Sequence, residues 1–242
     1  TEINRFINGP EAFTPDDDFI LGETEVGGFF VAAGFCAHGI TGGAGVGRYT
    51  AEWIVDGEPS MDLSKMDVRR FGKHYRSRRY ALARAHEIYA KHYDVKYPGE
   101  DYQAGRPLRL SPTYSRLAAL GAEFGEKAGW ERANWFRSNE DPAFETMKPR
   151  GWAGEHWSTA IVAEHVATRE RAGLFDETSF AKLEVSGPGA CAFLQRICAN
   201  DVDVPAGRVV YTQMLNRRGG IQCDLTATRL SAERFRIVTG TA

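Results

Sequence analysis

The sequence predicts an α+β fold, in which helices and antiparallel strands occupy separate parts of the chain. Two observations predict it. Near the N-terminus, the apolar run at residues 29–33 (FFVAA) precedes a glycine-rich segment and a helical pattern, as in a β–loop–α unit. Near the C-terminus, residues 209–239 alternate as three short strands separated by tight turns, which is typical of an antiparallel meander.

Residues 1–58 are expected to be the end of one domain. Turn-forming residues, beginning at Asn8, surround a short apolar piece at residues 19–21. The uninterrupted apolar run at residues 29–33 predicts a strand that is buried on both faces.

The segment that follows this strand is rich in glycine. Residues 39–47 contain five glycines and are expected to form a loop, and residues 44–55 are expected to form a helix. Gly57 should end that helix, because glycine after the last turn is a standard stop signal. The dinucleotide pattern GxGxxG is not met, since Arg48 stands where its third glycine would be.

Residues 59–108 are expected to connect two domains. Their charged, amphipathic part at residues 71–93 predicts a long surface helix, which the turn formers at residues 97–102 would end.

Residues 109–242 are expected to form the first part of a second domain. Ser111 is the predicted N-cap of its first helix, and residues 130–136 are predicted to lie in a loop-rich region. Three elements should follow before the meander: a helix at residues 158–171, a strand at 183–185 and a helix at 187–198.

The meander itself has clear limits. Strands are predicted at residues 209–215, 221–230 and 234–239, and the first two are separated by a turn at residues 216–220 that contains two adjacent glycines.

Composition excludes several kinds of function. A formal net charge of -2 gives no attraction for nucleic acid, and no apolar run approaches the roughly 20 residues of a membrane span. The four cysteines form no CxxC pair and the six histidines no HExxH motif, so we expect reduced thiols and no metal site. A cytoplasm or a mitochondrial matrix fits such thiols.

The chain has no initial Met and stops just after a strand-like run, so we expect a piece of a longer polypeptide.

Two places have residues suited to chemistry. Backbone without Cβ atoms lets a flat group approach the glycine segment, and the N–H groups of a helix start favour negative charge. The alternative is that these glycines only allow tight helix–sheet packing, with His38 a structural histidine. In the meander, Asp224 stands among apolar neighbours, so it should need a partner or a ligand. Its alternative is an ordinary aspartate on the solvent face of a hairpin.

The glycine segment resembles part of a known flavoenzyme family. Residues 29–45 (FFVAAGFCAHGITGGAG) and 51–59 are similar to the closing strand, loop and helix of the glycine-oxidase and sarcosine-oxidase flavin fold, and most of all to its dimethylglycine/sarcosine dehydrogenase branch. In that family this loop meets the isoalloxazine ring. The resemblance therefore implies FAD contacts for four residues: His38, Gly39, Ile40 and Thr41.

The second domain resembles the glycine-cleavage T-protein, an aminomethyltransferase. The similar segments include residues 111–114 (SPTY), 171–176 (RAGLFD) and 216–225 (NRRGGIQCDL). In that family the acidic residue after the Gly-Gly turn is the principal functional group of the tetrahydrofolate site, which implies this role for Asp224. The resemblance also implies that four residues line the folate pocket: Tyr211, Met214, Thr226 and Gly240.

Taken together, the resemblances imply an FAD-dependent amine dehydrogenase or oxidase. It would demethylate dimethylglycine or sarcosine, give electrons to oxygen or an electron-transfer flavoprotein, and pass the one-carbon unit to tetrahydrofolate. We expect this piece alone to be inactive. Three alternatives stay open: a demethylase for a betaine or methylaminobutanoate, a non-catalytic regulatory subunit of the same architecture, such as that of pyruvate dehydrogenase phosphatase, and, last, a lone aminomethyltransferase.

Overall fold

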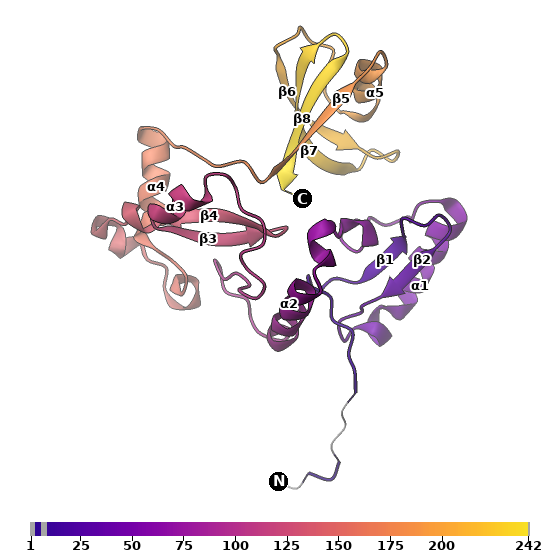
Figure 1. Ribbon diagram of the computed structural model, residues 1–242, viewed down its shortest axis with the longest axis horizontal. Helices are drawn as coiled ribbons and strands as arrows, with labels where there is room; N and C mark the ends of the chain where they lie inside the picture. The colour runs from indigo at the N-terminus through magenta and orange to yellow at the C-terminus, as the bar shows by residue number, and fades with distance from the viewer. Residues whose placement is uncertain (1–2, 6–8, 242) are drawn as a thin grey trace. The chain divides into compact units, whose positions relative to one another are not determined.

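The computed structural model describes residues 3–5 and 9–241 (Figure 1), so Asn8 and Ala242 lie outside the described residues. The chain divides into two compact units. The first comprises Thr1–Leu108 with Pro149–Trp157, and the second comprises Arg109–Lys148 with Ser158–Ala242. The expected α+β fold is confirmed, because helices are combined with strands that pair antiparallel in every sheet of the described residues.

The first unit is built on a small sheet and a long helix. Strand β1 (Ile20–Glu23) pairs antiparallel with β2 (Phe30–Ala33), and helix α1 (Gly39–Asp56) follows. The Trp53 ring of α1 lies against the backbone of Gly22, where φ is 100° and an added Cβ would come within 2.5 Å of the ring. Only glycine allows this close approach of helix and strand.

Two predictions for this unit were wrong. Strand β2 is not buried on both faces, because Phe30 and Val31 are only half-buried and Ala32 and Ala33 are exposed. The glycine segment is not a loop either: α1 begins at Gly39, not at residue 44. The predicted end of the helix is confirmed, since Gly57 has φ 82° and its N–H donates to the Trp53 carbonyl at 3.1 Å.

The expected surface helix at residues 71–93 is shorter and less exposed than predicted. Two short 3₁₀ turns, Val68–Arg70 and Lys73–Arg76, precede helix α2 (Arg78–Lys91). The side chain of Ser77 caps α2 by accepting a hydrogen bond from the Tyr80 N–H at 3.3 Å. Three residues of α2 are buried: Tyr80, Arg84 and Ile88.

The second unit opens with helix α3 (Tyr114–Ala119), whose N-cap is Thr113 and not Ser111 as predicted. Ser111 instead shares a hydrogen bond of 2.9 Å with the Thr113 hydroxyl. The predicted loop-rich region is a hairpin of β3 (Ala122–Lys127) and β4 (Trp130–Phe136). Its two turn residues both have positive φ, which is the backbone of a tight two-residue hairpin turn.

Helix α4 (Thr159–Glu170) confirms the predicted helix at residues 158–171, and the Ser158 hydroxyl caps it by accepting from the Ala160 N–H at 3.2 Å. Three further 3₁₀ turns precede it along the chain: Arg137–Asn139, Pro142–Met147 and Gly151–Gly154.

The meander is confirmed and forms part of a four-stranded sheet in the order β5-β8-β7-β6 (Figure 1). Its strands are β5 (Phe180–Ser186), β6 (Val209–Leu215), β7 (Ile221–Ser231) and β8 (Arg234–Thr241). Helix α5 (Ala190–Ile197) packs on one face of this sheet. The core between them consists of buried side chains from both: Ala190, Leu194, Cys198, Val202, Leu225, Ala227, Phe235 and Ile237.

Candidate functional site

The four residues expected to meet a flavin lie at the N-terminus of α1. His38 is the N-cap residue, and Gly39, Ile40 and Thr41 begin the first turn. All four are exposed. The first N–H groups of a helix have no partner within it, and the His38 side chain does not cap those of α1. This end of the helix therefore presents a positive partial charge that favours an anionic group.

The glycines of α1 are of two kinds. An added Cβ at Gly42 would lie 2.8 Å from the Phe19 ring, so this glycine serves packing. At Gly43, Gly45 and Gly47 an added Cβ would meet nothing within 4 Å. Packing alone therefore accounts for Gly42, whereas Gly43 and Gly47, one turn apart, leave one face of α1 open and without side chains.

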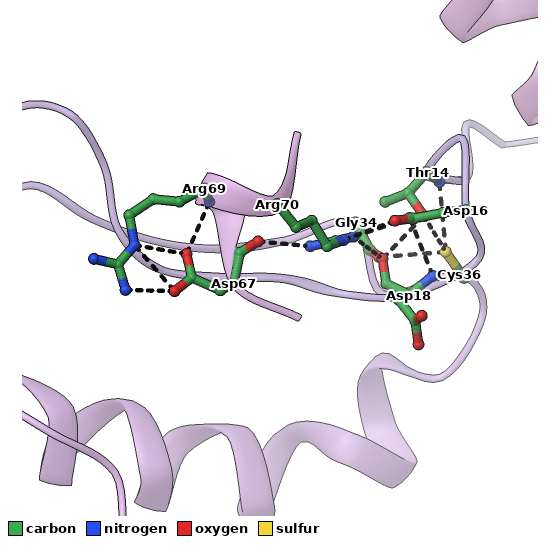
Figure 2. Close-up of polar contacts among 8 residues, drawn as sticks. All are labelled: Thr14, Asp16, Asp18, Gly34, Cys36, Asp67, Arg69 and Arg70. Carbon is green, nitrogen blue, oxygen red and sulfur yellow. Dashed lines mark hydrogen bonds and ion pairs between the residues drawn. The ribbon is translucent and has the colours of Figure 1, made fainter. Parts of the chain in front are cut away.

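The turn that leads into α1 has an unusual backbone. Cys36 and Ala37 have φ of 45° and 65°, a left-handed conformation that costs a non-glycine residue about 1–2 kcal/mol. The buried Cys36 side chain holds this turn: its sulfur lies 3.5 Å from the Thr14 hydroxyl and 3.3 Å from the Gly34 carbonyl (Figure 2). Strained backbone persists where its surroundings hold it, and it concentrates at functional sites.

An ion pair anchors the segment that contains Thr14 to the connecting region. Arg70 donates from Nε to Asp16 Oδ2 at 2.7 Å and from Nη2 to Asp16 Oδ1 at 2.9 Å, and it also donates to the Asp18 carbonyl at 3.0 Å (Figure 2). Arg70 thus holds the segment that contacts Cys36, and it lies 54 positions beyond Asp16 in the chain.

Sequence reasoning missed one feature beside His38. The ring of His92, from the C-terminal end of α2, lies edge-on to the His38 ring with centroids 5.1 Å apart. Asp17 accepts a hydrogen bond from His92 at 3.2 Å. These residues are far apart in sequence and belong to no common motif, so the sequence offered no signal for the cluster.

The residues expected at a folate site lie on the four-stranded sheet. Tyr211 pairs with Thr226, and Asp224 lies two positions before Thr226 on the same strand. Because alternate residues of a strand face opposite sides, these three side chains share the face away from α5. Gly240 is exposed on the neighbouring strand β8. Met214 is not brought together with them, since it packs against the core on the other face.

Asp224 does not lie among apolar side chains, as its sequence neighbours suggested. Cys223 and Leu225 point to the core, whereas Asp224 is exposed. Its carboxylate accepts a hydrogen bond from the Tyr211 hydroxyl at 3.1 Å. The Thr239 hydroxyl donates to the backbone carbonyl of Asp224 at 2.7 Å, which joins β7 to β8 at this point. The structure thus places an exposed carboxylate beside a phenol.

Among residues 3–5 and 9–241, no group of three histidine, cysteine or acidic side chains could hold a metal ion. In the same part of the chain, no helix is long and apolar enough to cross a membrane. A small cavity in the first unit is lined by charged residues and one tyrosine: Lys91, Asp94, Lys96, Glu100, Asp101 and Tyr102.

Three protein families match successive parts of the chain. Residues 1–53 match the FAD dependent oxidoreductase family, and residues 56–111 match the FAD dependent oxidoreductase central domain. Residues 113–242 match the GCVT N-terminal domain. These matches define a class of protein in which a flavin-dependent oxidoreductase is joined to a folate-binding domain of the T-protein type.

Individual relatives match the chain over nearly its whole length. It is 43% identical over 98% of its residues to 4-methylaminobutanoate oxidase (formaldehyde-forming) of Paenarthrobacter nicotinovorans. It is 37% identical over 99% to the mitochondrial pyruvate dehydrogenase phosphatase regulatory subunit of Mus musculus, and 36% identical over 96% to the mitochondrial sarcosine dehydrogenase of Homo sapiens. In each case the chain spans 28% of the relative's own length.

The chain belongs to the dimethylglycine/sarcosine dehydrogenase family, which confirms the resemblance drawn from its sequence. Enzymes of this family are FAD-dependent oxidoreductases that act on N-methyl amines, and the family also includes the phosphatase regulatory subunit.

Proposed function

We propose that the protein containing this chain is an FAD-dependent oxidoreductase that demethylates dimethylglycine or sarcosine and passes the one-carbon unit to tetrahydrofolate. The observation that carries the proposal is the start of α1, where uncapped N–H groups and open glycines stand together. We assign residues 1–58 to the end of the FAD domain, 59–108 to a connecting segment and 109–242 to the first part of the folate domain.

The start of α1 fits one edge of a flavin. When bound, FAD supplies the acceptor for a hydride from the N-methyl carbon of the substrate. The backbone N–H groups of Gly39, Ile40 and Thr41 would stabilise negative charge on the ring. Gly43 and Gly47, one turn apart on the same face, leave room for a flat group to come close to the helix. His38 would border the same group.

The exposed face of the four-stranded sheet fits the folate half of the reaction. Loss of the hydride leaves a carbon–nitrogen double bond that carries positive charge, and a folate nitrogen attacks its carbon. Asp224 would stabilise that charge and orient the attacking nitrogen, and Tyr211 would hold its carboxylate. Thr226 and Gly240 would line the same face. Met214 would only support the sheet from its core side.

Joining the two half-reactions in one protein has a chemical reason. The oxidised N-methyl group hydrolyses to formaldehyde and the demethylated amine if water reaches it before folate does. A second site that captures this carbon therefore prevents loss of the one-carbon unit. We propose oxygen or an electron-transfer flavoprotein as the electron acceptor, and a bacterial cytoplasm or a mitochondrial matrix as the location.

A second candidate substrate is 4-methylaminobutanoate, which the name of one relative contains. The chain is 43% identical to the 4-methylaminobutanoate oxidase, compared with 36% to the human sarcosine dehydrogenase. This substrate has a longer spacing between nitrogen and carboxylate than sarcosine has. A non-catalytic regulatory role is the other candidate, since the phosphatase regulatory subunit is 37% identical.

The full-length protein provides the deciding experiment. Its visible absorption spectrum should show bound flavin, and that flavin should be bleached by one of three substrates under anaerobic conditions: dimethylglycine, sarcosine or 4-methylaminobutanoate. The substrate that bleaches fastest identifies the amine. A protein that binds no flavin and is reduced by none of the three would support the regulatory role and overturn the proposal.

The role proposed for Asp224 has its own test. In the full-length protein, Asp224→Asn should keep flavin reduction at the wild-type rate while the product shifts from methylene-tetrahydrofolate to free formaldehyde, because only the folate half is changed. Tyr211→Phe should shift it in the same direction by a smaller amount. Glu233→Gln, in the turn after β7 of the same sheet, is the matched control and should change neither product. An unchanged methylene-tetrahydrofolate yield in Asp224→Asn removes this residue from the mechanism.

A further inference from the structure

The His92 side chain is buried in the first unit, but one of its ring nitrogens has no hydrogen-bond partner among the described residues. Its side chain is only 7% exposed, and the Phe13 and His38 rings each lie edge-on to it with centroids 5.1 Å away. Its Nε2 atom is buried and has no hydrogen-bond partner among the described residues. An unpaired buried nitrogen is costly, so an apolar ring would fill this space at lower cost if packing were its only purpose.

Asp17 fixes the orientation of this ring. Both carboxylate oxygens lie near His92 Nδ1, at 3.2 and 3.3 Å, so Nδ1 carries a proton and donates it to the carboxylate. Asp17 itself has φ 66°, a left-handed backbone that aspartate and asparagine tolerate better than most residues. The ring of His92 is thus tied at one nitrogen to a turn 75 residues earlier in the chain.

His38 is held from two sides. Its Nδ1 donates to the Cys36 carbonyl at 2.7 Å, within the strained turn before α1, and its ring rests edge-on against His92. A side chain held at both its polar and its apolar surface keeps one rotamer.

We propose that Asp17 and His92 are positioning residues, which act as a tether that holds the His38 imidazole in place at the start of α1. The tether fixes the ring that borders the flavin, so this inference rests on the proposed function. Neither residue touches the flavin; both act through His38.

Two substitutions at Asp17 separate the tether from simple packing. Both glycine and asparagine accept the left-handed backbone at this position. Asp17→Asn keeps an oxygen that accepts from His92 Nδ1, whereas Asp17→Gly removes it. His92→Phe keeps the ring but loses the donor. The matched control is His86→Gln. His86 lies on α2, the helix that His92 caps at its C-terminal end, and its side chain is exposed.

The first measurement follows His38 directly in the full-length protein freed of flavin. Diethylpyrocarbonate modifies unprotonated imidazole nitrogen, and peptide mass spectrometry gives the rate at each histidine. Asp17→Gly and His92→Phe should each raise the His38 rate by about two- to tenfold, because in both variants the ring at position 92 loses its bond to Asp17 and its edge-on contact with His38 loosens; the range is that of such a ring contact. Asp17→Asn and His86→Gln should leave it at the wild-type value, and the double variant Asp17→Gly/His92→Phe should equal either single one.

The second measurement is the visible circular dichroism of the flavin in the full-length holoprotein, where Asp17→Gly and His92→Phe should change the band as His38→Ala does. Equal His38 modification rates in Asp17→Gly and Asp17→Asn would overturn the tether, whatever the flavin does. If His38→Ala leaves the flavin band unchanged, the flavin placement in the proposed function fails instead, and the modification rates still decide the tether.

Discussion

At the scale of single residues, Asp16 connects the N-terminal segment to the connecting region through Arg70. The pair is bidentate, and the two side chains are only 25% and 15% exposed. Asp16→Ala should therefore lower the free energy of unfolding by about 1–2 kcal/mol, more than an exposed ion pair contributes. Urea denaturation measures this change. The control is Glu25→Ala, which removes a pair whose side chains are 71% and 88% exposed and should cost less than about 0.5 kcal/mol. Equal costs for the two variants would show that Asp16 is not an anchor.

In the second unit, Asp176 is held by hydrogen bonds from uncharged groups: it accepts from the Thr113 hydroxyl at 2.6 Å and from the Thr178 N–H at 3.0 Å. Burial alone would raise the pKa of Asp176, but hydrogen bonds from Ser111, Thr113 and Thr178 outweigh it, and the pKa lies well below its usual value. Because the folded state has the lower pKa, the carboxylate stabilises the fold above the unfolded value of about 4 and loses this effect as the pH falls through the folded value.

The corresponding prediction compares wild type with Asp176→Asn. The wild type should be the more stable at pH 6, and the difference should shrink steadily below about pH 4, because the Asp176 carboxylate of the unfolded chain takes up a proton there while that of the folded protein stays charged. Thermal unfolding of wild type and Asp176→Asn, measured in steps from about pH 6 to about pH 2, gives this difference in stability as a function of pH. A difference that stays constant across the range would mean that the hydrogen bonds to Asp176 do not depend on its charge.

At the scale of elements, the two kinds of glycine in α1 predict opposite effects of one substitution. Gly43→Ala should raise the stability by about 0.5–1 kcal/mol, because alanine favours a helix and its Cβ meets open space. Gly42→Ala should lower the stability, since the Cβ would lie 2.8 Å from the Phe19 ring. Flavin affinity of the full-length protein should fall in Gly43→Ala despite its higher stability. A stabilised Gly43→Ala variant with unchanged flavin affinity would show that the open face is not used.

The elements that sequence patterns predicted well are those fixed by local chemistry. The limits of β6 follow from its alternation and from the glycine turn after it, and Gly57 ends α1 as expected. The start of α1 was predicted five residues too late because glycine has low helix propensity, which contacts such as Gly42 against Phe19 overcome. The hairpin of β3 and β4 was missed because its Ala128-Gly129 turn lacks the usual asparagine or aspartate.

The residues of the candidate sites also divide into those that a contiguous motif predicts and those that only folding brings together. His38 and Asp224 stand in contiguous motifs, so a family resemblance could point to them. The Asp17–His92 contact joins residues 75 positions apart and exists only after folding. The sequence left two interpretations of Asp224 open, and the structure shows the exposed one, because strand alternation turns its apolar neighbours to the opposite face.

At the scale of the whole molecule, the two proposed half-sites lie in different units of the chain, and the chain spans 28% of the length of its relatives. Its 242 residues contain no GxGxxG segment to bind the pyrophosphate of FAD. The start of α1 would contact the flavin ring at one edge only, and a few backbone N–H groups cannot provide the affinity that the pyrophosphate contacts add.

The 242-residue chain supplied with FAD, tetrahydrofolate and each of the three N-methyl substrates should therefore give no turnover above that of a buffer blank. Formaldehyde and methylene-tetrahydrofolate should both stay at background, while the full-length protein in the same assay produces them. The reason is physical: hydride transfer requires the flavin to be held within contact of the N-methyl carbon, and under the proposed function this chain would supply only one wall of that site. A clear substrate-dependent rate from the isolated chain would contradict this prediction and place a complete flavin site within its residues.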